Sequence, residues 1–167
     1  MDQDNAPHLA SCHCGAVQFR VQLSDGFNTI RRCTCSYCRM RGAVTATALE
    51  GGIAFVQGED NLSLYRFNTH TAQHYFCKTC GIYTHHRRRS NPKQFGINVA
   101  CLAGESQFDF PEVLVMDWVV HHLDGDGRDR VAGVLRFSAD CSGCKHNIAF
   151  CYHSALRHKL RLGWIFG

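Results

Sequence analysis

Apolar and polar residues alternate over short segments along most of the chain, and these segments are rich in β-branched and aromatic residues. Alternation of this kind is typical of half-buried β-strands. Clusters of Gly, Asn, Asp and Pro separate the segments, one of them the Gly51–Gly52 pair. The pattern predicts strands at residues 16–22, 44–49, 53–56, 62–67, 74–76, 82–86, 95–101 and 131–137.

A spacing of about ten residues per strand is typical of an all-β sandwich or barrel and not of strands that alternate with helices. No amphipathic helical stripe longer than two turns occurs before residue 145. We therefore expect an all-β domain over residues 8–138. Residues 139–167 form a C-terminal extension of mixed periodicity, in which 154–162 could be a short basic helix or part of an atypical tail.

The composition is that of an ordinary globular chain, because 45% of its 167 residues are hydrophobic and 19% are charged. No apolar run approaches the roughly 18 residues of a membrane span. The first ten residues hold two acids and no Lys or Arg, so they do not resemble a signal peptide. We expect a cytoplasmic protein without a membrane partner. The net charge of +4 is too small to indicate nucleic acid as a partner by itself.

The chain contains eleven cysteines, and disulfides are rare in the compartment expected for it. Thiolate or metal chemistry is the better expectation. Seven of the cysteines fall in three tight clusters, namely Cys12 and Cys14, then Cys33, Cys35 and Cys38, then Cys77 and Cys80. Cys101 lies alone in an apolar segment, where a buried structural thiol is expected.

Tetrahedral zinc holds its sulfur ligands about 3.8 Å apart, whereas residues i and i+2 of a straight strand are about 6.6 Å apart. A C-x-C pair can therefore bind one zinc only where the chain bends, and Gly15 follows the first pair. Two pairs make a closed four-sulfur site, which leaves Cys33, Cys35 and Cys38 as an open three-sulfur site. The sequence thus predicts two zinc ions per chain. A swap between pairs, or recruitment of His13 or His74, also satisfies this counting.

Three thiolates give an open zinc site a net charge of −1, which disfavours activation of water and favours a further sulfur ligand. Thiol chemistry is therefore expected there. Arg31, Arg32, Arg39 and Arg41 flank the cluster, and could pair with the carboxylates of an anionic thiol such as glutathione or simply form a solvated rim. Arg39 and Arg41 are the predicted substrate contacts among them.

Four segments resemble a known family: SCHCGAVQF at 11–19, CTCSYCRMRGAV at 33–44, FCKTCGIY at 76–83 and INVACL at 97–102. Together they are similar to the glutathione-dependent formaldehyde-activating enzymes, which include the centromere protein V type of domain. The resemblance covers roughly residues 8–138, and the extension has no counterpart in the family. It implies a β-tent fold of two small antiparallel sheets with zinc at their junctions.

The resemblance also implies a structural zinc on Cys12, Cys14, Cys77 and Cys80 and a catalytic zinc on Cys33, Cys35 and Cys38. The activity that it implies is the condensation of formaldehyde with glutathione to S-hydroxymethylglutathione, a carbon–sulfur lyase reaction run backwards.

Two further features carry candidate residues. In the run of residues 85–89 (HHRRR), His86 and Arg88 would share one face of a strand, so that a histidine could serve the open site as a proton shuttle. The run could equally be a basic hairpin end in solvent. Asn98 lies in an apolar segment, where its amide needs partners and could contact substrate or serve the structure.

Two other hypotheses compete with a zinc enzyme that acts on a thiol adduct. One is a non-enzymatic zinc module that contacts protein or nucleic acid through its basic surface, and the other is a redox or metal-buffering role for the second cluster. In the extension, Cys141, Cys144, Cys151 and His153 have the ligand types of a third zinc site.

Overall fold

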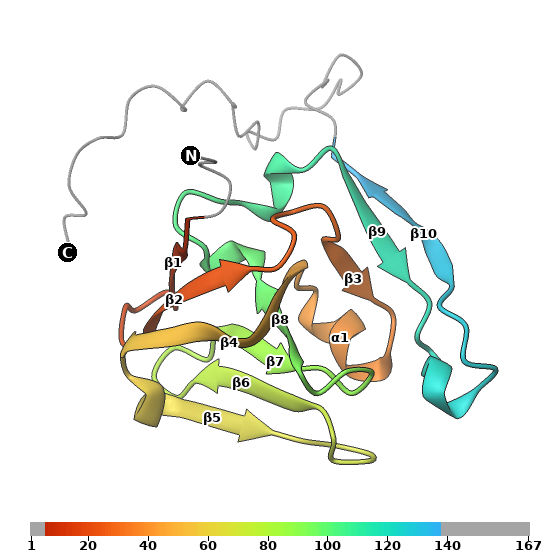
Figure 1. Cartoon of the computed structure of the whole chain (residues 1–167), viewed down its shortest axis with the longest axis horizontal. Coiled ribbons are helices and arrows are strands. Elements are labelled where there is room, and N and C mark those ends of the chain that lie inside the picture. Colours follow the sequence, from red (N-terminus) through yellow and green to blue (C-terminus); the bar gives the residue numbers. More distant parts are fainter. Residues whose placement is uncertain (1–5, 138–167) are drawn as a thin grey trace, which may run out of the picture.

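The computed structural model describes residues 6–137, which form ten strands joined in one sheet (Figure 1). The all-β prediction is confirmed, since helical structure in this range is limited to α1 (Ser36–Arg41) and short 3-10 turns. The strands are β1 (His8–Ser11), β2 (Gln18–Leu23), β3 (Arg31–Cys33), β4 (Thr45–Gln57), β5 (Leu62–Tyr65), β6 (Gln73–Cys77), β7 (Tyr83–Arg87), β8 (Gln94–Asn98), β9 (Glu112–Met116) and β10 (Val131–Arg136).

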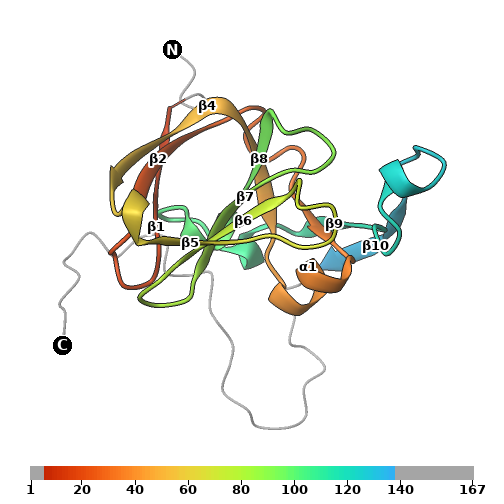
Figure 2. The same ribbon diagram turned by 90° about the horizontal axis from the view of Figure 1, so that it is seen from below.

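The sheet is mixed and continuous, with the strand order β10-β9-β3-β4-β8-β7-β6-β5 and with β2 pairing both β1 and β4. All pairs are antiparallel except β3 with β9. The resemblance implied separate small antiparallel sheets, and the structure corrects this description. The strands join because β4 pairs with β8 along its first part and with β2 mainly along its second part. Figure 2 shows β4 arching over β5 and β6, with the β9–β10 hairpin projecting to one side.

The two strands predicted at 44–49 and 53–56 are a single strand, so the turn expected at Gly51–Gly52 is wrong. Gly51 has a φ of +83°, which an L side chain rarely adopts, and a Cβ at Gly52 would lie 3.0 Å from the carbonyl oxygens of Gln22 and Leu49. The glycine pair therefore bends β4 without ending it, and the register with β2 shifts between Val21 and Leu23.

The segment predicted as a strand at 95–101 ends early. β8 stops at Asn98, whose side chain accepts a hydrogen bond from the Ala100 N–H and starts a 3-10 turn, Val99–Cys101. β1, β3 and β9 were not predicted. β1 and β3 are short and two of the three residues of β3 are arginines, whereas β9 (EVLVM) is an apolar run that the sequence analysis overlooked.

The core lies between β2, β4 and β8. Phe19, Val21, Val44 and Ile97 are fully buried there, and each such side chain contributes on the order of 1.5–3 kcal/mol by leaving water. None of the helices within residues 6–137 has the length and apolar character that a bilayer crossing demands. The boundary predicted at 138 and the extension 139–167 lie at or beyond the end of the described residues.

Candidate metal centres

The first group of cysteines joins two distant turns. Cys12 and Cys14 follow β1, Cys77 ends β6 and Cys80 lies in the turn before β7. The four Sγ atoms lie within 4.8 Å of one another. The Sγ distances are 3.6 Å from Cys12 to Cys14 and 3.8 Å from Cys14 to Cys77. These values match the edge of about 3.8 Å expected for a tetrahedral zinc–thiolate site.

Glycine shapes both turns. The N–H of Gly15 donates to the Cys12 carbonyl at 3.1 Å, and the N–H of Gly81 donates to the Cys77 carbonyl at 2.9 Å. Both glycines have positive φ, at +74° and +73°. The bend predicted at Cys12–Gly15 is therefore present, and it brings two sulfurs together that a straight strand would hold apart.

Two sulfurs of this group accept hydrogen bonds from N–H donors, which stabilise the thiolate form. Val17 N–H donates to Cys12 Sγ at 3.3 Å, and Asn61 Nδ2 donates to Cys77 Sγ at 3.6 Å. Burial nevertheless raises the pKa of the Cys12 thiol to about 12. Four crowded sulfurs can all be thiolates only when a cation joins them, so this donor set fits zinc.

The second group is local. Cys33 ends β3, Cys35 caps the N-terminus of α1, and Cys38 lies inside that helix. Backbone N–H groups donate to two of the sulfurs, from Cys35 to Cys33 Sγ at 3.3 Å and from Cys38 to Cys35 Sγ at 3.4 Å. Gly42, in the left-handed conformation, ends the helix by donating its N–H to the Cys38 carbonyl. The three sulfurs lie within 4.8 Å of one another.

These three thiols share protons. Hydrogen bonds with Cys33 and Cys38 lower the pKa of Cys35, whereas hydrogen bonds with Cys35 and Cys38 raise the pKa of Cys33. Without a cation, only part of the group can therefore be ionised at neutral pH. A soft divalent cation would replace the shared protons, so this set also fits zinc, with three protein ligands.

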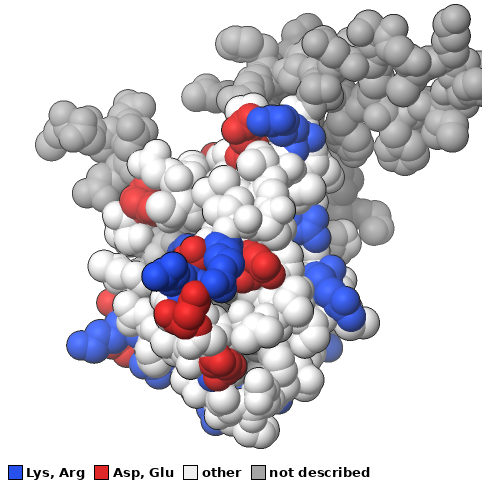
Figure 3. Space-filling view, turned by 90° about the vertical axis from the view of Figure 1, so that its right-hand side faces the viewer, with Lys and Arg blue, Asp and Glu red and all other residues white. Residues whose placement is uncertain are grey.

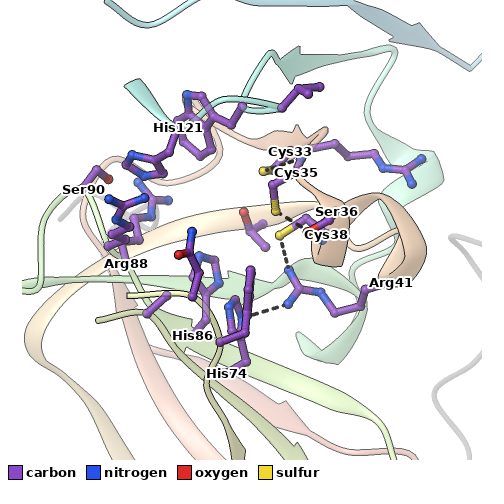
Figure 4. A pocket seen from close by; sticks show the side chains of 18 of the residues that line it. Cys33, Cys35, Ser36, Cys38, Arg41, His74, His86, Arg88, Ser90 and His121 are labelled. Carbon is purple, nitrogen blue, oxygen red and sulfur yellow. Dashed lines mark hydrogen bonds between the residues drawn. The ribbon is translucent and has the colours of Figure 1, made fainter. Parts of the chain in front are cut away.

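A cavity of about 310 Å³ opens beside the second group and not beside the first. Its size is at the lower end of the range for small-molecule sites. Figure 4 shows the three cysteines on one side of it. His86 and Arg88 lie on the opposite side, and Arg41 approaches from the same side as the cysteines.

Arg41 is fixed by three partners. Its Nη2 donates to Cys38 Sγ at 3.3 Å, its Nη1 lies 3.2 Å from His74 Nδ1, and its guanidinium lies 3.4 Å from the Tyr83 ring centre. Burial, followed by the charge of Arg41, lowers the pKa of His74 to about 4, so His74 is neutral. A permanent cation thus lies against the cysteine sulfurs with no carboxylate beside it among residues 6–137.

His86 is a second neutral histidine at the cavity. Its Nδ1 lies 2.5 Å from the Tyr83 hydroxyl. Burial, followed by the charge of Arg41, holds its pKa well below the usual value. His86 and Arg88 share a face, as predicted, whereas His85 is turned to the opposite face and stacks on Tyr75. The hairpin end expected in solvent is wrong for Arg88, whose exposed fraction is 5%.

The family model described as "Glutathione-dependent formaldehyde-activating enzyme" matches residues 7–116. This range holds all seven clustered cysteines and most of the sheet. The chain belongs to the glutathione-dependent formaldehyde-activating enzyme family. The family fits the ordered cysteine motifs from which the resemblance was drawn.

This family member is similar to two known proteins. A Halomonas elongata protein assigned by name to the glutathione-dependent formaldehyde-activating enzymes is 37% identical over 78 residues, which cover 42% of this chain and 49% of that protein. The chain thus spans about half the length of this curated relative. The crystal structure of a Rhodobacter sphaeroides protein from structural genomics has 55% sequence identity and a TM-score of 0.62, covering 63% of this chain and 96% of the other.

The structure brings together the two predicted sets of cysteines, and neither His13 nor His74 joins the sulfur groups. Of the other predicted site residues in this family member, Arg41 reaches the cavity, whereas Arg39 is exposed on α1 away from it. Asn98 is buried, donates to the Tyr83 carbonyl at 2.8 Å and caps the turn that follows. The substrate roles of Arg39 and Asn98 stay predictions.

Some cavity residues were missed by the sequence analysis. Trp118 and His121 line the cavity although they lie far along the chain from the cysteines. The Thr34 hydroxyl accepts from the Trp118 N–H at 2.9 Å, and the parallel pairing of β9 with β3 carries this segment to the site. No local sequence motif predicts a contact between residues so far apart along the chain. The predicted third metal set, which begins at Cys141, lies outside the described residues.

Proposed function

We propose that this protein is a zinc-dependent carbon–sulfur lyase-type enzyme that acts on a thiol adduct, such as S-hydroxymethylglutathione formed from formaldehyde and glutathione. The observation that carries the proposal is the open position of the second cysteine group. Cys33, Cys35 and Cys38 converge beside a cavity of about 310 Å³, whereas the four-cysteine group Cys12, Cys14, Cys77 and Cys80, whose Sγ atoms lie within 4.8 Å of one another, does not line it.

In this proposal Cys12, Cys14, Cys77 and Cys80 would hold a structural zinc that ties β1 to the β6–β7 turn. Cys33, Cys35 and Cys38 would hold a second zinc, which when bound accepts a substrate sulfur as thiolate. A zinc ion with three thiolate ligands would have a net charge of −1, and the adjacent Arg41 guanidinium would offset it. The eight cysteines within residues 6–137 are all free, which suits a reducing compartment such as the cytoplasm.

The reaction forms one carbon–sulfur bond. The thiol loses its proton, its sulfur attacks the formaldehyde carbon, the carbonyl π electrons move to oxygen, and that oxygen takes a proton to become the hydroxymethyl group. Neutral His86 lines the cavity, and a hydrogen bond from the Tyr83 hydroxyl to Nδ1 would leave Nε2–H as a donor. A donor placed there would stabilise the charge that develops on the oxygen.

Trp118, Val119 and Phe67 also line the cavity, and their apolar surfaces would limit the access of water to the thiolate. Limited access of water favours attack of the thiolate on formaldehyde over a reaction in which water is the nucleophile. It is also consistent with the charge argument, because a zinc with three thiolate ligands is a poor activator of water.

The alternative is a non-enzymatic zinc module that contacts protein or nucleic acid through basic residues. Its main candidate surface is largely neutralised, because Arg87 pairs with Glu50 and Arg89 pairs with Asp124, while Arg88 is buried. On the face of the molecule drawn in Figure 3, acidic and basic side chains are intermixed near the centre. Nucleic acid normally requires a coherent basic patch, so this alternative has less support from the described residues.

The test is a rate measurement with a matched cysteine control. Exchange of formaldehyde into S-hydroxymethylglutathione would be followed by NMR for the zinc-loaded protein, for Cys35→Ser and for Cys101→Ser. We expect Cys35→Ser to reduce the exchange to the uncatalysed rate, and Cys101→Ser, outside both groups, to leave it high. The proposal fails if the Cys35→Ser protein is folded, retains one zinc and accelerates exchange as the wild type does.

A further inference from the structure

Arg31, Arg32 and Arg88 line the cavity and form no salt bridge with any residue between 6 and 137. Their neighbours differ in this respect, because Arg89 is held by both carboxylate oxygens of Asp124 and Arg41 is turned onto Cys38 Sγ. The cavity therefore contains guanidinium groups with which no carboxylate of residues 6–137 forms a salt bridge.

Arg88 is the more deeply placed of the two, with an exposed fraction of 5%. Its Nη2 donates to Thr47 Oγ1 at 2.9 Å and its Nη1 to Gln94 Oε1 at 3.4 Å. These neutral oxygens orient the guanidinium without cancelling its charge. Burial, followed by the charge of Arg31, lowers the pKa of Arg88 to about 10, so the group is still a cation at neutral pH. The charge of Asp25 acts on the pKa of Arg88 in the opposite sense, but no salt bridge between the two is formed. A buried cation without a paired counter-charge is costly, which indicates a ligand.

Arg31 is the first residue of β3 and lines the same cavity. It lies two residues before Cys33, so the two side chains share one face of the strand with Cα atoms about 6.6 Å apart. Its guanidinium lies 5.8 Å from the Trp118 ring centre. Asp129 and Asp25 are near enough to influence the pKa of Arg31, but neither pairs with it. Asp25 instead accepts from Thr29, and its Oδ1 is buried without a hydrogen bond.

Arg32 also lines the cavity without a salt bridge in the described range, but its Nη2 lies over Gly42 at the end of α1. Because Arg32 alternates with Arg31 along β3, it does not share the face of Cys33. Arg31 and Arg88 are thus the pair that combines a place in the cavity with orientation by neighbouring side chains.

We propose that Arg31 and Arg88 form an anion subsite that binds a carboxylate of the substrate while its sulfur lies at Cys33, Cys35 and Cys38. This inference rests on the proposed function. It adds to that function which class of thiol the cavity would bind. Arg88 lies across the cavity from the cysteines (Figure 4), so the carboxylate must be several bonds from the sulfur. Thiols with such a carboxylate are selected, whereas small neutral thiols and cationic thiols are not.

The test uses calorimetry on the zinc-loaded full chain with three probes. Glutathione offers both a thiol and carboxylates, S-methylglutathione keeps the carboxylates but has no thiol, and 2-mercaptoethanol has only the thiol. For Arg88→Gln and Arg31→Gln we expect glutathione and S-methylglutathione to bind at least about tenfold more weakly, with 2-mercaptoethanol unchanged. Arg20→Gln, which removes an exposed positive charge on β2, is the matched control and should change none of the three.

Arg31→Gln keeps the test decisive if loss of the bonds to Thr47 and Gln94 prevents folding of the Arg88 variant. The subsite is refuted if a folded variant binds glutathione and S-methylglutathione as tightly as the wild type, or if Arg20→Gln weakens them equally. If S-methylglutathione binds as well as glutathione, and 2-mercaptoethanol not at all, the subsite stands and the thiol chemistry of the proposed function fails. The two failures are therefore separable.

Discussion

Arg41 Nη2 donates a hydrogen bond to Cys38 Sγ at 3.3 Å, and the same guanidinium covers the face of the Tyr83 ring. Arg41 Nε is buried and has no hydrogen-bond partner. A buried guanidinium is tolerable where negative charge lies close, and Cys38 Sγ would supply that charge as a metal-bound thiolate. This contact links α1, which carries Cys38 and Arg41, to β7, which carries Tyr83 and His86.

Removing this cation should loosen the second metal site. We predict that Arg41→Gln weakens zinc binding at Cys33, Cys35 and Cys38 by roughly 10–100-fold, since it deletes a hydrogen bond to a ligand sulfur and a neighbouring charge. Competition with a chelator would measure this. Arg39→Gln, an exposed position on the same helix, is the control. Equal affinity of the two variants would show that Arg41 does not support the site.

The Tyr83 hydroxyl should matter for turnover and not for thiol binding. In Tyr83→Phe the ring that covers Arg41 is kept, while the contact to His86 Nδ1 is lost. We expect kcat to fall about tenfold, on the order of 1 kcal/mol, because the His86 tautomer is no longer fixed. The dissociation constant of glutathione should stay within about twofold of the wild-type value. A change in binding with unchanged kcat would contradict this role.

Gly96 makes room for the His86 ring. A Cβ at Gly96 would overlap that ring, which lies directly across the β7–β8 pair. We predict that Gly96→Ala lowers the free energy of unfolding by on the order of 1–3 kcal/mol, as overpacking does. Gly133→Ala on β10 is the control, since no atom lies within 4 Å of its added Cβ. Thermal unfolding of both variants measures the difference, and equal midpoints would contradict the account.

His85 should make stability depend on pH. Burial lowers its pKa from 6.5 to about 4, so the unfolded chain binds a proton more readily than the folded one. Stability from this group is present above pH 6.5 and is lost as the pH falls toward 4, by up to about 3 kcal/mol. His85→Gln should therefore flatten the fall in unfolding free energy between these pH values. If the unfolding free energy of the wild type and of His85→Gln fell in parallel with pH, His85 would not be the cause of the fall. Loss of metal at low pH would affect both proteins alike.

The sequence was most informative where the chemistry is local. Cys33, Cys35 and Cys38 are gathered by one strand end and one short helix, and Cys12–Gly15 by one turn, so their spacing alone indicates ligand groups. Alternation also predicted that His86 and Arg88 share a face. These features depend on backbone geometry over a few residues, which a sequence displays directly.

Features set by distant pairing were not predictable in this way. The parallel contact of β9 with β3 brings Trp118 to the cavity, and the register of β6 with β7 places His74 opposite His86. Gly51 and Gly52 were misjudged because a glycine pair can end a strand or bend it, and only the neighbouring β2 decides between these. Burial of Arg88 depends on Thr47 and Gln94 in the same way.

X-ray absorption at the zinc edge tests the central claim most directly, because it counts sulfur neighbours. For a zinc-loaded chain we predict two zinc ions with an average of about 3.5 sulfur ligands each, the mean of four and three. Saturating glutathione should raise this average to about 4, and S-methylglutathione should leave it unchanged. A single zinc per chain, or a sulfur number that glutathione does not alter, would contradict an open three-cysteine site for thiols.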